Sequence, residues 1–318
     1  MGIVQLLILL VMAFMISTVA TSLAIPILQR KHTGQNIREE GPLSHMSKSG
    51  TPSMGGIAII AATLVTVVAT KQLTLTTGIL VFGLVAFGAI GFADDYLKII
   101  RRNNLGLRAW QKFGLQTIGA LALVLAMSLV LDRGTLVLLP FTGETFDLGK
   151  WYVPFAVFVV LAMVNSVNLT DGLDGLASGV TGVVAVFFAL AGVTLANAVG
   201  SSFAICLAGA CIGFLIFNRY PAKIFMGDTG SLALGGGLAA VAILLNMELF
   251  LPIVGFIFVI EALSVIIQVV SFKTRGKRVF KMSPIHHHFE LSGMKETKVV
   301  GMFWVATIIF CGIGIGAM

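Results

Sequence analysis

The 318-residue sequence is poor in charge. Asp, Glu, Lys and Arg make up only 11% of it, whereas hydrophobic residues make up 57%. A soluble domain of this length would carry roughly 25% charged residues. The mean hydropathy is correspondingly high, at +1.00. The shortage of charge excludes an ordinary soluble domain and predicts an all-α protein that crosses a membrane several times.

Several familiar signatures are also missing. The three cysteines lie in apolar stretches without a CxxC pair, which is typical of small buried hydrophobic residues. The sequence has neither the HExxH metal motif nor the GxxxxGK[ST] phosphate loop. No Lys or Arg precedes the first apolar stretch, so we expect an uncleaved first helix rather than a signal peptide.

Ten apolar stretches approach the roughly 20 residues that a helix needs to cross a bilayer. We expect helices over 3–27, 54–70, 76–94, 113–131, 151–167, 175–195, 200–217, 230–246, 250–271 and 299–317. The connections are too short for a second soluble domain, so we expect one integral membrane domain over 1–318. An even number of crossings puts both termini on the same side.

The distribution of positive charge predicts which side that is. The loops after the odd-numbered helices hold 18 of the 21 Lys and Arg residues, and the other loops hold three. By the positive-inside rule, the odd-numbered loops are cytoplasmic and both termini are extracytoplasmic. The net charge of +7 therefore reports orientation, and we expect no nucleic-acid partner.

Two adjacent carboxylates, Asp94 and Asp95, stand at the end of the third stretch, in GFADDYLK. A charge beside hydrocarbon is costly, and two neighbouring carboxylates repel each other unless a cation lies near them. If the helix continues, Lys98 lies one turn after Asp94 and pairs with it. That pairing would explain Asp94 without chemistry, but it leaves Asp95 unexplained.

Further acidic residues follow the fifth and seventh stretches. Asp171 and Asp174 are spaced i, i+3 after Asn168, so a helix would put both on one side. An acidic first turn that favours the helix dipole would explain only one of them. Asp228, between two glycines before an apolar stretch, is either a ligand or a helix N-cap.

The first and ninth loops carry phosphate-binding candidates. The segment KSGTPSMGG, which begins at Lys48, either presents backbone N–H groups to an anion or caps the second helix. His286, His287 and His288 follow Pro284. Neutral His can donate to phosphate and move protons. On a regular helix the three rings would point about 100° apart, but in a loop or first turn after Pro284 two of them could converge. A solvated loop is the alternative for this tract.

These groups gather on the predicted cytoplasmic face. A transporter usually has polar groups near the midplane of the bilayer, where this chain has only Glu261, which shares an inward-facing helix side with Gln268. Carboxylates without cysteines favour Mg²⁺ with phosphate oxygens. Basic and His residues would neutralise a transferring phosphoryl group. The residues thus indicate Mg²⁺-dependent phosphoryl-type transfer to a membrane-embedded substrate at the inner surface.

Four motifs in order, GFADDYLK, NLTDGLDGLASG, FMGDTGSLALGG and SPIHHHFE, resemble the polyprenyl-phosphate N-acetylhexosamine-1-phosphate transferase superfamily. The triple histidine and GPLSHMSKSGTPSMGG narrow the resemblance to the bacterial phospho-N-acetylmuramoyl-pentapeptide transferases. It runs from about Arg38 to the last helix. One departure is Ser53, where the family has Thr in TPTMGG, and the hydroxyl is kept.

The resemblance implies transfer of phospho-MurNAc-pentapeptide from its UDP carrier to undecaprenyl phosphate, which gives lipid I and UMP in the first membrane step of peptidoglycan synthesis. It also implies Mg²⁺, a homodimer and a bacterial cytoplasmic membrane. It assigns Asp228 to the metal, His286 to catalysis, and Asp94 or Asp95 to the role of base or nucleophile. The implied substrate-binding residues are Lys48, Ser53, Lys98, Asn168, Asp171, Asp174, Asn218, Phe225, Gln268, His287 and His288.

Two rival functions remain open at this point. One is a relative in the same superfamily that transfers GlcNAc-1-phosphate, against which the triple histidine and the first-loop motif argue. The other is a nucleotide-sugar or lipid transporter.

Overall fold

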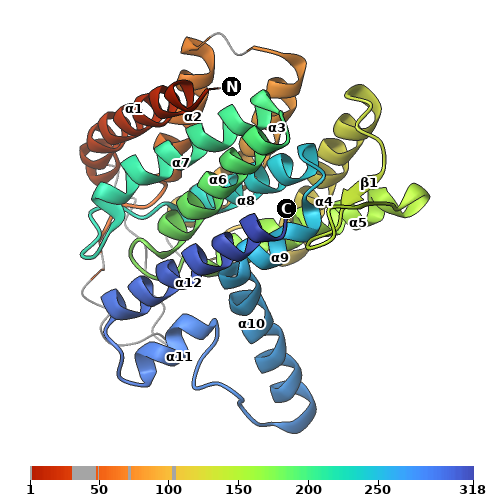
Figure 1. The fold of residues 1–318 in the computed structure, drawn as a ribbon. Helices are drawn as coiled ribbons and strands as arrows, with labels where there is room; N and C mark the ends of the chain where they lie inside the picture. Colours follow the sequence, from red (N-terminus) through yellow and green to blue (C-terminus); the bar gives the residue numbers. More distant parts are fainter. Residues whose placement is uncertain (1, 31–47, 49, 71–72, 102–104) are drawn as a thin grey trace.

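The computed structural model describes residues 2–30, 48, 50–70, 73–101 and 105–318. In these residues long helices pack side by side in a bundle (Figure 1). The α-helices are α1 (Ile3–Arg30), α2 (Gly56–Ala69), α3 (Leu75–Arg101), α4 (Ala109–Leu125), α5 (Tyr152–Thr170), α6 (Leu176–Thr194), α7 (Ala198–Asn218), α8 (Gly227–Leu244), α9 (Leu251–Val254), α10 (Phe256–Arg275), α11 (Ile285–Leu291) and α12 (Glu296–Gly316). A π-helical turn, Ala126–Val130, extends α4, and 3₁₀ turns at Gly149–Trp151 and Glu248–Phe250 precede α5 and α9.

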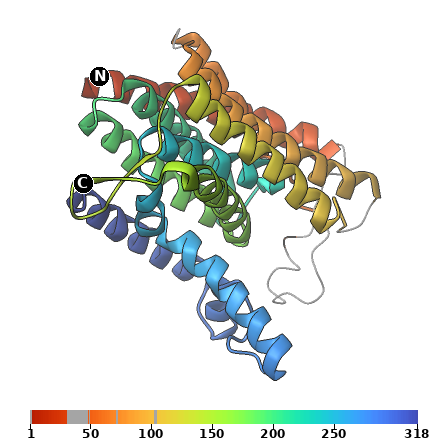
Figure 2. The ribbon, with the colours of Figure 1, turned by 90° about the vertical axis from the view of Figure 1, so that its right-hand side faces the viewer.

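Across the described ranges, nine helices are long and apolar enough to cross a membrane, so the chain is a multi-pass membrane protein. The second predicted helix, 54–70, is the one that falls short. It forms as α2 where the sequence places it but has only 14 residues. That is shorter than the roughly 20 residues of a full crossing. Figure 2 shows both termini toward the same end of the bundle.

A small sheet departs from the all-α prediction. Strands β1 (Leu136–Leu138) and β2 (Thr145–Asp147) pair antiparallel between α4 and α5, in a segment for which no structure was predicted. The hairpin is attached to the bundle by a backbone hydrogen bond from Leu138 N to Asn246 O, at 2.7 Å. Three-residue strands give too short an alternation for the sequence pattern to reveal.

Helix α8 forms the centre of the bundle because its small residues let neighbours approach closely. A Cβ on Gly91 of α3 would lie 2.0 Å from the carbonyl oxygen of Asp228. Further along, a Cβ on Gly236 of α8 would lie 2.4 Å from the carbonyl oxygen of Gly83. Small residues allow helix backbones to come this near in a membrane protein. The contact fixes the end of α3 against the beginning of α8.

Two predicted boundaries were wrong. Helix α3 continues to Arg101, so Asp94 and Asp95 lie within its last turns rather than at its end. The loop predicted between the fifth and sixth stretches does form: α5 ends at Thr170, and Gly175, at φ +79°, leads into α6 at Leu176. The stretch 250–271 is divided at Gly255 into α9 and α10. Figures 1 and 2 show α10 and α11 extending away from the rest of the bundle.

Candidate active site

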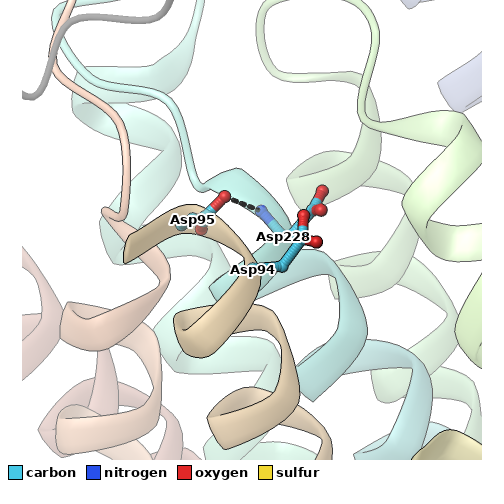
Figure 3. A group of neighbouring side chains, drawn as sticks. All are labelled: Asp94, Asp95 and Asp228. Atoms are coloured by element: carbon cyan, nitrogen blue, oxygen red, sulfur yellow. Dashed lines mark hydrogen bonds between the residues drawn. The ribbon is translucent and has the colours of Figure 1, made fainter. Parts of the chain in front are cut away.

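The three carboxylates Asp94, Asp95 and Asp228 meet where the end of α3 touches the beginning of α8 (Figure 3). One ligand oxygen from each lies within 4.8 Å of those of the other two. The pairing of Asp94 and Asp95 with a distant aspartate follows from the close contact at Gly91, which leaves no side chain between the helices. We call these three residues the carboxylate triad.

Asp95 caps α8. Its Oδ2 accepts hydrogen bonds from the backbone N–H of Thr229, at 2.9 Å, and from the Thr229 hydroxyl, at 2.7 Å. Its Oδ1 accepts one from the backbone N–H of Asp228, at 3.2 Å. The first N–H groups of a helix have no intrahelical partners, and a carboxylate also complements the helix dipole. Asp228 is therefore not the cap of its own helix.

Gly227, at the first position of α8, has φ +70°, in the left-handed region that glycine adopts readily. A Cβ there would lie 2.6 Å from Asp95 Oδ2 and 2.8 Å from the Ser53 hydroxyl. The Ser53 Oγ is buried and has no hydrogen-bond partner among the described residues. Ser53 thus lies beside the triad with an unused polar atom.

Asp228 accepts hydrogen bonds from three side chains. Its Oδ2 receives Lys98 Nζ at 2.8 Å and Lys112 Nζ at 2.7 Å, and its Oδ1 receives Asn168 Nδ2 at 2.8 Å. The Asp228 side chain is 17% exposed, against 4% for Asp94 and 4% for Asp95. Among the triad, Asp228 is therefore the most accessible to a ligand.

Asp94 makes the predicted i, i+4 pair with Lys98, with Oδ2 and Nζ 2.6 Å apart. Its Oδ1 accepts the backbone N–H of Leu107 at 2.7 Å, which ties the segment after α3 back to that helix. Lys98 bridges Asp94 and Asp228 rather than belonging to Asp94 alone. The pairing therefore does not remove Asp94 from the site.

Lys112 was not among the predicted site residues. It lies on α4, 116 positions from Asp228 in the sequence, and also approaches Asp94 Oδ2 at 3.8 Å. In the sequence it is one of several basic residues after the third stretch, where topology alone accounts for positive charge. No local pattern distinguishes it, because only the packing of α4 brings it to the triad.

The turn after α5 contains the next predicted residues. Asp174 pairs with Lys48 Nζ at 2.7 Å and accepts the Ala222 N–H at 2.9 Å. Glu296, which was not predicted, also binds Lys48, at 2.6 Å. Lost hydration and the nearby Asp228, Asp95 and Asp174 raise the pKa of Asp171 well above its usual value. The turn thus adds a second acidic group beside the triad, held by a lysine from the first loop.

The three histidines lie on the short helix α11, where the rings of His286 and His287 contact each other and His288 packs against Phe280 and Phe289. His286 Nδ1 lies 3.0 Å from Glu261 Oε2, and His287 Nδ1 lies 3.0 Å from Glu290 Oε2. His288 Nδ1 accepts the backbone N–H of Lys281 at 3.2 Å. His286 and His287 lie in the first turn after Pro284, where two rings were expected to be able to converge, and their ring centroids are 4.1 Å apart.

The remaining predicted residues make hydrogen bonds that hold loops in place. The Gln268 amide binds the backbone of Val279 and Phe280 at 2.9 to 3.0 Å. Asn218, which is buried, accepts the Ser178 hydroxyl and donates to Ile224 O, so its side chain holds the segment before α8. The Phe225 backbone pairs with Pro52 and Gly55. Residues 41–47 and Ser49 of the first-loop motif lie outside the described residues.

The arrangement combines oxygen ligands with ammonium groups at one end of the bundle. Carboxylate oxygens suit a hard divalent cation such as Mg²⁺. The two lysines on Asp228 are cations that can also bind phosphate oxygens. The site therefore has the groups needed to hold two phosphate-containing molecules together.

The sequence matches the family model described as glycosyl transferase family 4 over residues 77–246. Residues 48–60 match signature 1 of the phospho-N-acetylmuramoyl-pentapeptide-transferases, which includes Lys48 and Ser53. These matches cover all three triad residues and the first-loop segment beside them.

Curated relatives that carry the name phospho-N-acetylmuramoyl-pentapeptide-transferase match nearly the whole chain. The protein from Alkaliphilus metalliredigens is 51% identical over 97% of this chain and 96% of its own length. The one from Clostridium beijerinckii is 52% identical over 97% and 95%, and the one from Heliobacterium modesticaldum is 49% identical over 92% and 91%. With this identity over full length, the chain belongs to the phospho-N-acetylmuramoyl-pentapeptide-transferase family.

Proposed function

We propose that the protein transfers phospho-MurNAc-pentapeptide from UDP-MurNAc-pentapeptide to undecaprenyl phosphate, which gives undecaprenyl-pyrophosphoryl-MurNAc-pentapeptide (lipid I) and UMP. The family supports the substrates and the reaction. The observation that carries the proposal is the carboxylate triad with Lys98 and Lys112 at one end of a bundle of membrane helices. An enzyme that joins a cytosolic nucleotide to a membrane lipid needs its charged groups at that boundary.

We propose ten crossings, with both termini extracytoplasmic and the triad on the cytoplasmic side of the bacterial plasma membrane. The placement of both termini toward one end supports a crossing by α2, despite its length (Figure 2). The excess of Lys and Arg in the odd-numbered loops supports the orientation. The homodimer that the resemblance implies belongs to the same proposal.

We assign the lipid phosphate to Asp94, Asp95 and Lys98, with Lys112 added by the geometry. The nucleotide-sugar is assigned to the turn of Asn168, Asp171 and Asp174, with Lys48, Ser53 and Asn218 beside it. Phe225 and Gln268 are assigned to the uridine, and His286, His287 and His288 to the sugar-phosphate region.

The donor set fits Mg²⁺. Three aspartate oxygens lie within 4.8 Å of one another, and Asp228, the most exposed, accepts two lysine ammonium groups in the place where positive charge is needed. We propose Asp228 as the main ligand, with Asp94 beside it. When bound, the ion would neutralise phosphate oxygens and polarise them toward transfer.

The side chains themselves account for binding and orientation. Two anionic phosphate groups repel each other, and Lys98 and Lys112 supply positive charge at the point where both must enter. Asp95 is held by three hydrogen bonds to α8, two of them from backbone N–H groups. Asp94 Oδ2 faces the ammonium groups of Lys98 and Lys112, so we assign the reacting role to Asp94. As a base it would take the proton of the lipid phosphate, whose oxygen then attacks the sugar-bearing phosphorus while UMP leaves. As a nucleophile its carboxylate would attack that phosphorus itself, UMP would leave, and the lipid phosphate would then displace the carboxylate.

Purified protein in detergent or nanodiscs, supplied with UDP-MurNAc-pentapeptide, undecaprenyl phosphate and Mg²⁺, tests the proposal. We expect release of UMP and formation of lipid I. UMP release with UDP-GlcNAc instead would favour GlcNAc-1-phosphate transfer. Binding of the nucleotide-sugar without turnover would favour a transporter, and either of these results contradicts the proposal.

A further inference from the structure

A buried glutamate–histidine pair packs against the turn between α5 and α6 and is not part of the carboxylate triad. Glu261 of α10 and His286 of α11 are both 0% exposed, and His286 Nδ1 lies 3.0 Å from Glu261 Oε2. Glu261 was expected to face the protein interior, and it does, but nothing in the sequence connected it with His286. Removing a glutamate and a histidine from water together is costly unless they interact.

The hydrogen bond between Glu261 and His286 has a defined direction. With the Glu261 carboxylate oxygen as acceptor, His286 donates from Nδ1, and in the neutral ring this leaves Nε2 without a proton. Within the part of the chain that the structure describes, this buried Nε2 has no hydrogen-bond partner, and neither has Glu261 Oε1. Two unpaired buried polar atoms cost roughly 1–3 kcal/mol each, which a side chain with a purely structural role would avoid.

The unpaired nitrogen faces the turn between α5 and α6. A Cβ on Gly172 would lie 2.2 Å from His286 Nε2 and 2.6 Å from Cε1, so the imidazole edge packs directly on the Gly172 backbone. Gly172 stands between Asp171 and Asp174 in the sequence. A change in the tilt or tautomer of the ring therefore changes its contact with the turn that carries these two aspartates.

We propose that Glu261 is a positioning residue for the transfer reaction: it holds His286 as the Nδ1–H tautomer, and the ring in turn holds the Gly172 turn in its binding conformation. The inference rests on the proposed function, because that turn is assigned there to the nucleotide-sugar. It adds Glu261 to the residues that support the reaction, and it says how Glu261 acts: through His286 of α11 on the turn at Gly172. The same logic orients the histidine ligands of metal sites, where a carboxylate fixes the ring through its second nitrogen.

The tautomer is measured directly by ¹⁵N NMR of the protein labelled at its five histidines, with the His286 signals identified by their absence in His286→Asn. We expect a protonated Nδ1 and a bare Nε2 in the folded, substrate-free protein. In Glu261→Gln, whose amide can either donate or accept, we expect a mixture of tautomers. A proton on Nε2 of the unaltered protein would overturn the proposal, whether or not any variant folds.

The kinetic consequence is specific to one substrate. In Glu261→Gln we expect kcat/KM for UDP-MurNAc-pentapeptide to fall about 10–100-fold, the range for supporting carboxylates of this kind, with KM for undecaprenyl phosphate within about twofold. Ser264→Ala is the matched control, because Ser264 is also buried on α10 and donates to Glu261 O. Equal losses for both substrates, or the same effect in the control, would reduce Glu261 to a structural group.

A double variant separates action through His286 from direct action. If Glu261 works only through the ring, adding Glu261→Gln to His286→Ala should change kcat/KM by less than about twofold. A full additional loss would contradict the proposed order. Failure of the proposed function is recognised separately: the unaltered protein would then show no turnover, while the NMR spectrum would still report the state of the pair.

Discussion

Asp95 on α3 accepts both the backbone N–H and the hydroxyl of Thr229 on α8, at 2.9 and 2.7 Å. One carboxylate of the acidic pair is thus a helix cap provided by a neighbouring helix. The other two members of the triad face lysine ammonium groups. The adjacent aspartates therefore differ in role, although the sequence presents them as equals.

Asp95→Asn is expected to destabilise the fold. An amide in place of the carboxylate turns an N–H₂ toward the donors of α8 and leaves at least one of them unsatisfied, at a cost of about 1–3 kcal/mol. We expect a lower midpoint of thermal unfolding in detergent than for Thr229→Ala, which removes one bond only. A midpoint equal to that of the unaltered protein would contradict the capping role.

Asp228→Asn is expected to abolish most Mg²⁺-dependent turnover while the protein still inserts and folds. The three hydrogen bonds that the Asp228 carboxylate accepts all come from side chains and not from the backbone, so its charge matters more for binding than for packing. We expect UMP release to fall at least about 100-fold. Glu144→Gln, an exposed change at the β hairpin, is the control, and near-normal turnover of Asp228→Asn would remove Asp228 from the metal.

Lys112→Met tests the residue that only the structure brought to the site. The change removes one of two ammonium groups on Asp228, so the phosphate groups meet less positive charge. We expect kcat/KM to fall about 100-fold in the same UMP-release assay. Lys150→Met, which removes an exposed lysine just before α5, should leave it unchanged. Equal activity of the two variants would mean that Lys98 alone suffices.

Arg133→Met tests a buried ion pair beyond the other end of α8. Arg133 Nη2 lies 2.6 Å from Glu248 Oε1, with the two side chains 4% and 0% exposed. Helix α8 separates the pair from the triad by about 27 Å, at 1.5 Å for each of its residues. Glu248 would then be buried without a cation, with only the Tyr152 hydroxyl still donating to its Oε1 at 2.8 Å. Losing the ion pair should cost about 3–5 kcal/mol, seen as a lower unfolding midpoint. The kcat of the folded fraction should not change, and a selective loss of kcat would contradict this assignment.

Cysteine labelling tests the orientation. The three natural cysteines are buried, so single cysteines at the exposed positions Glu144 and Lys277 can be compared in intact cells. A membrane-impermeant maleimide should label position 144 from outside and position 277 only after permeabilisation. Labelling of position 277 from outside would invert the topology and separate the site from its cytosolic substrate.

The apolar stretches predicted most helices to within a few residues, because hydrocarbon thickness limits the length of a crossing. The order of the motifs also indicated the family. The sequence could not show that Lys112 reaches Asp228 or that Glu296 reaches Lys48, because these pairs depend on how helices pack far apart in the chain. The division at Gly255 and the α11 helix were missed because each is short and breaks the hydrophobic period only locally.

The contact of α3 with α8 at Gly91 and Gly236 limits how this protein can vary. The glycines that let the backbones touch also determine where Asp94, Asp95 and Asp228 meet. The same α3–α8 contact therefore supports both the site and the centre of the bundle. A substitution at this α3–α8 contact should alter folding as well as chemistry. Tolerance to mutation should therefore be lowest there and highest in exposed segments such as 273–279.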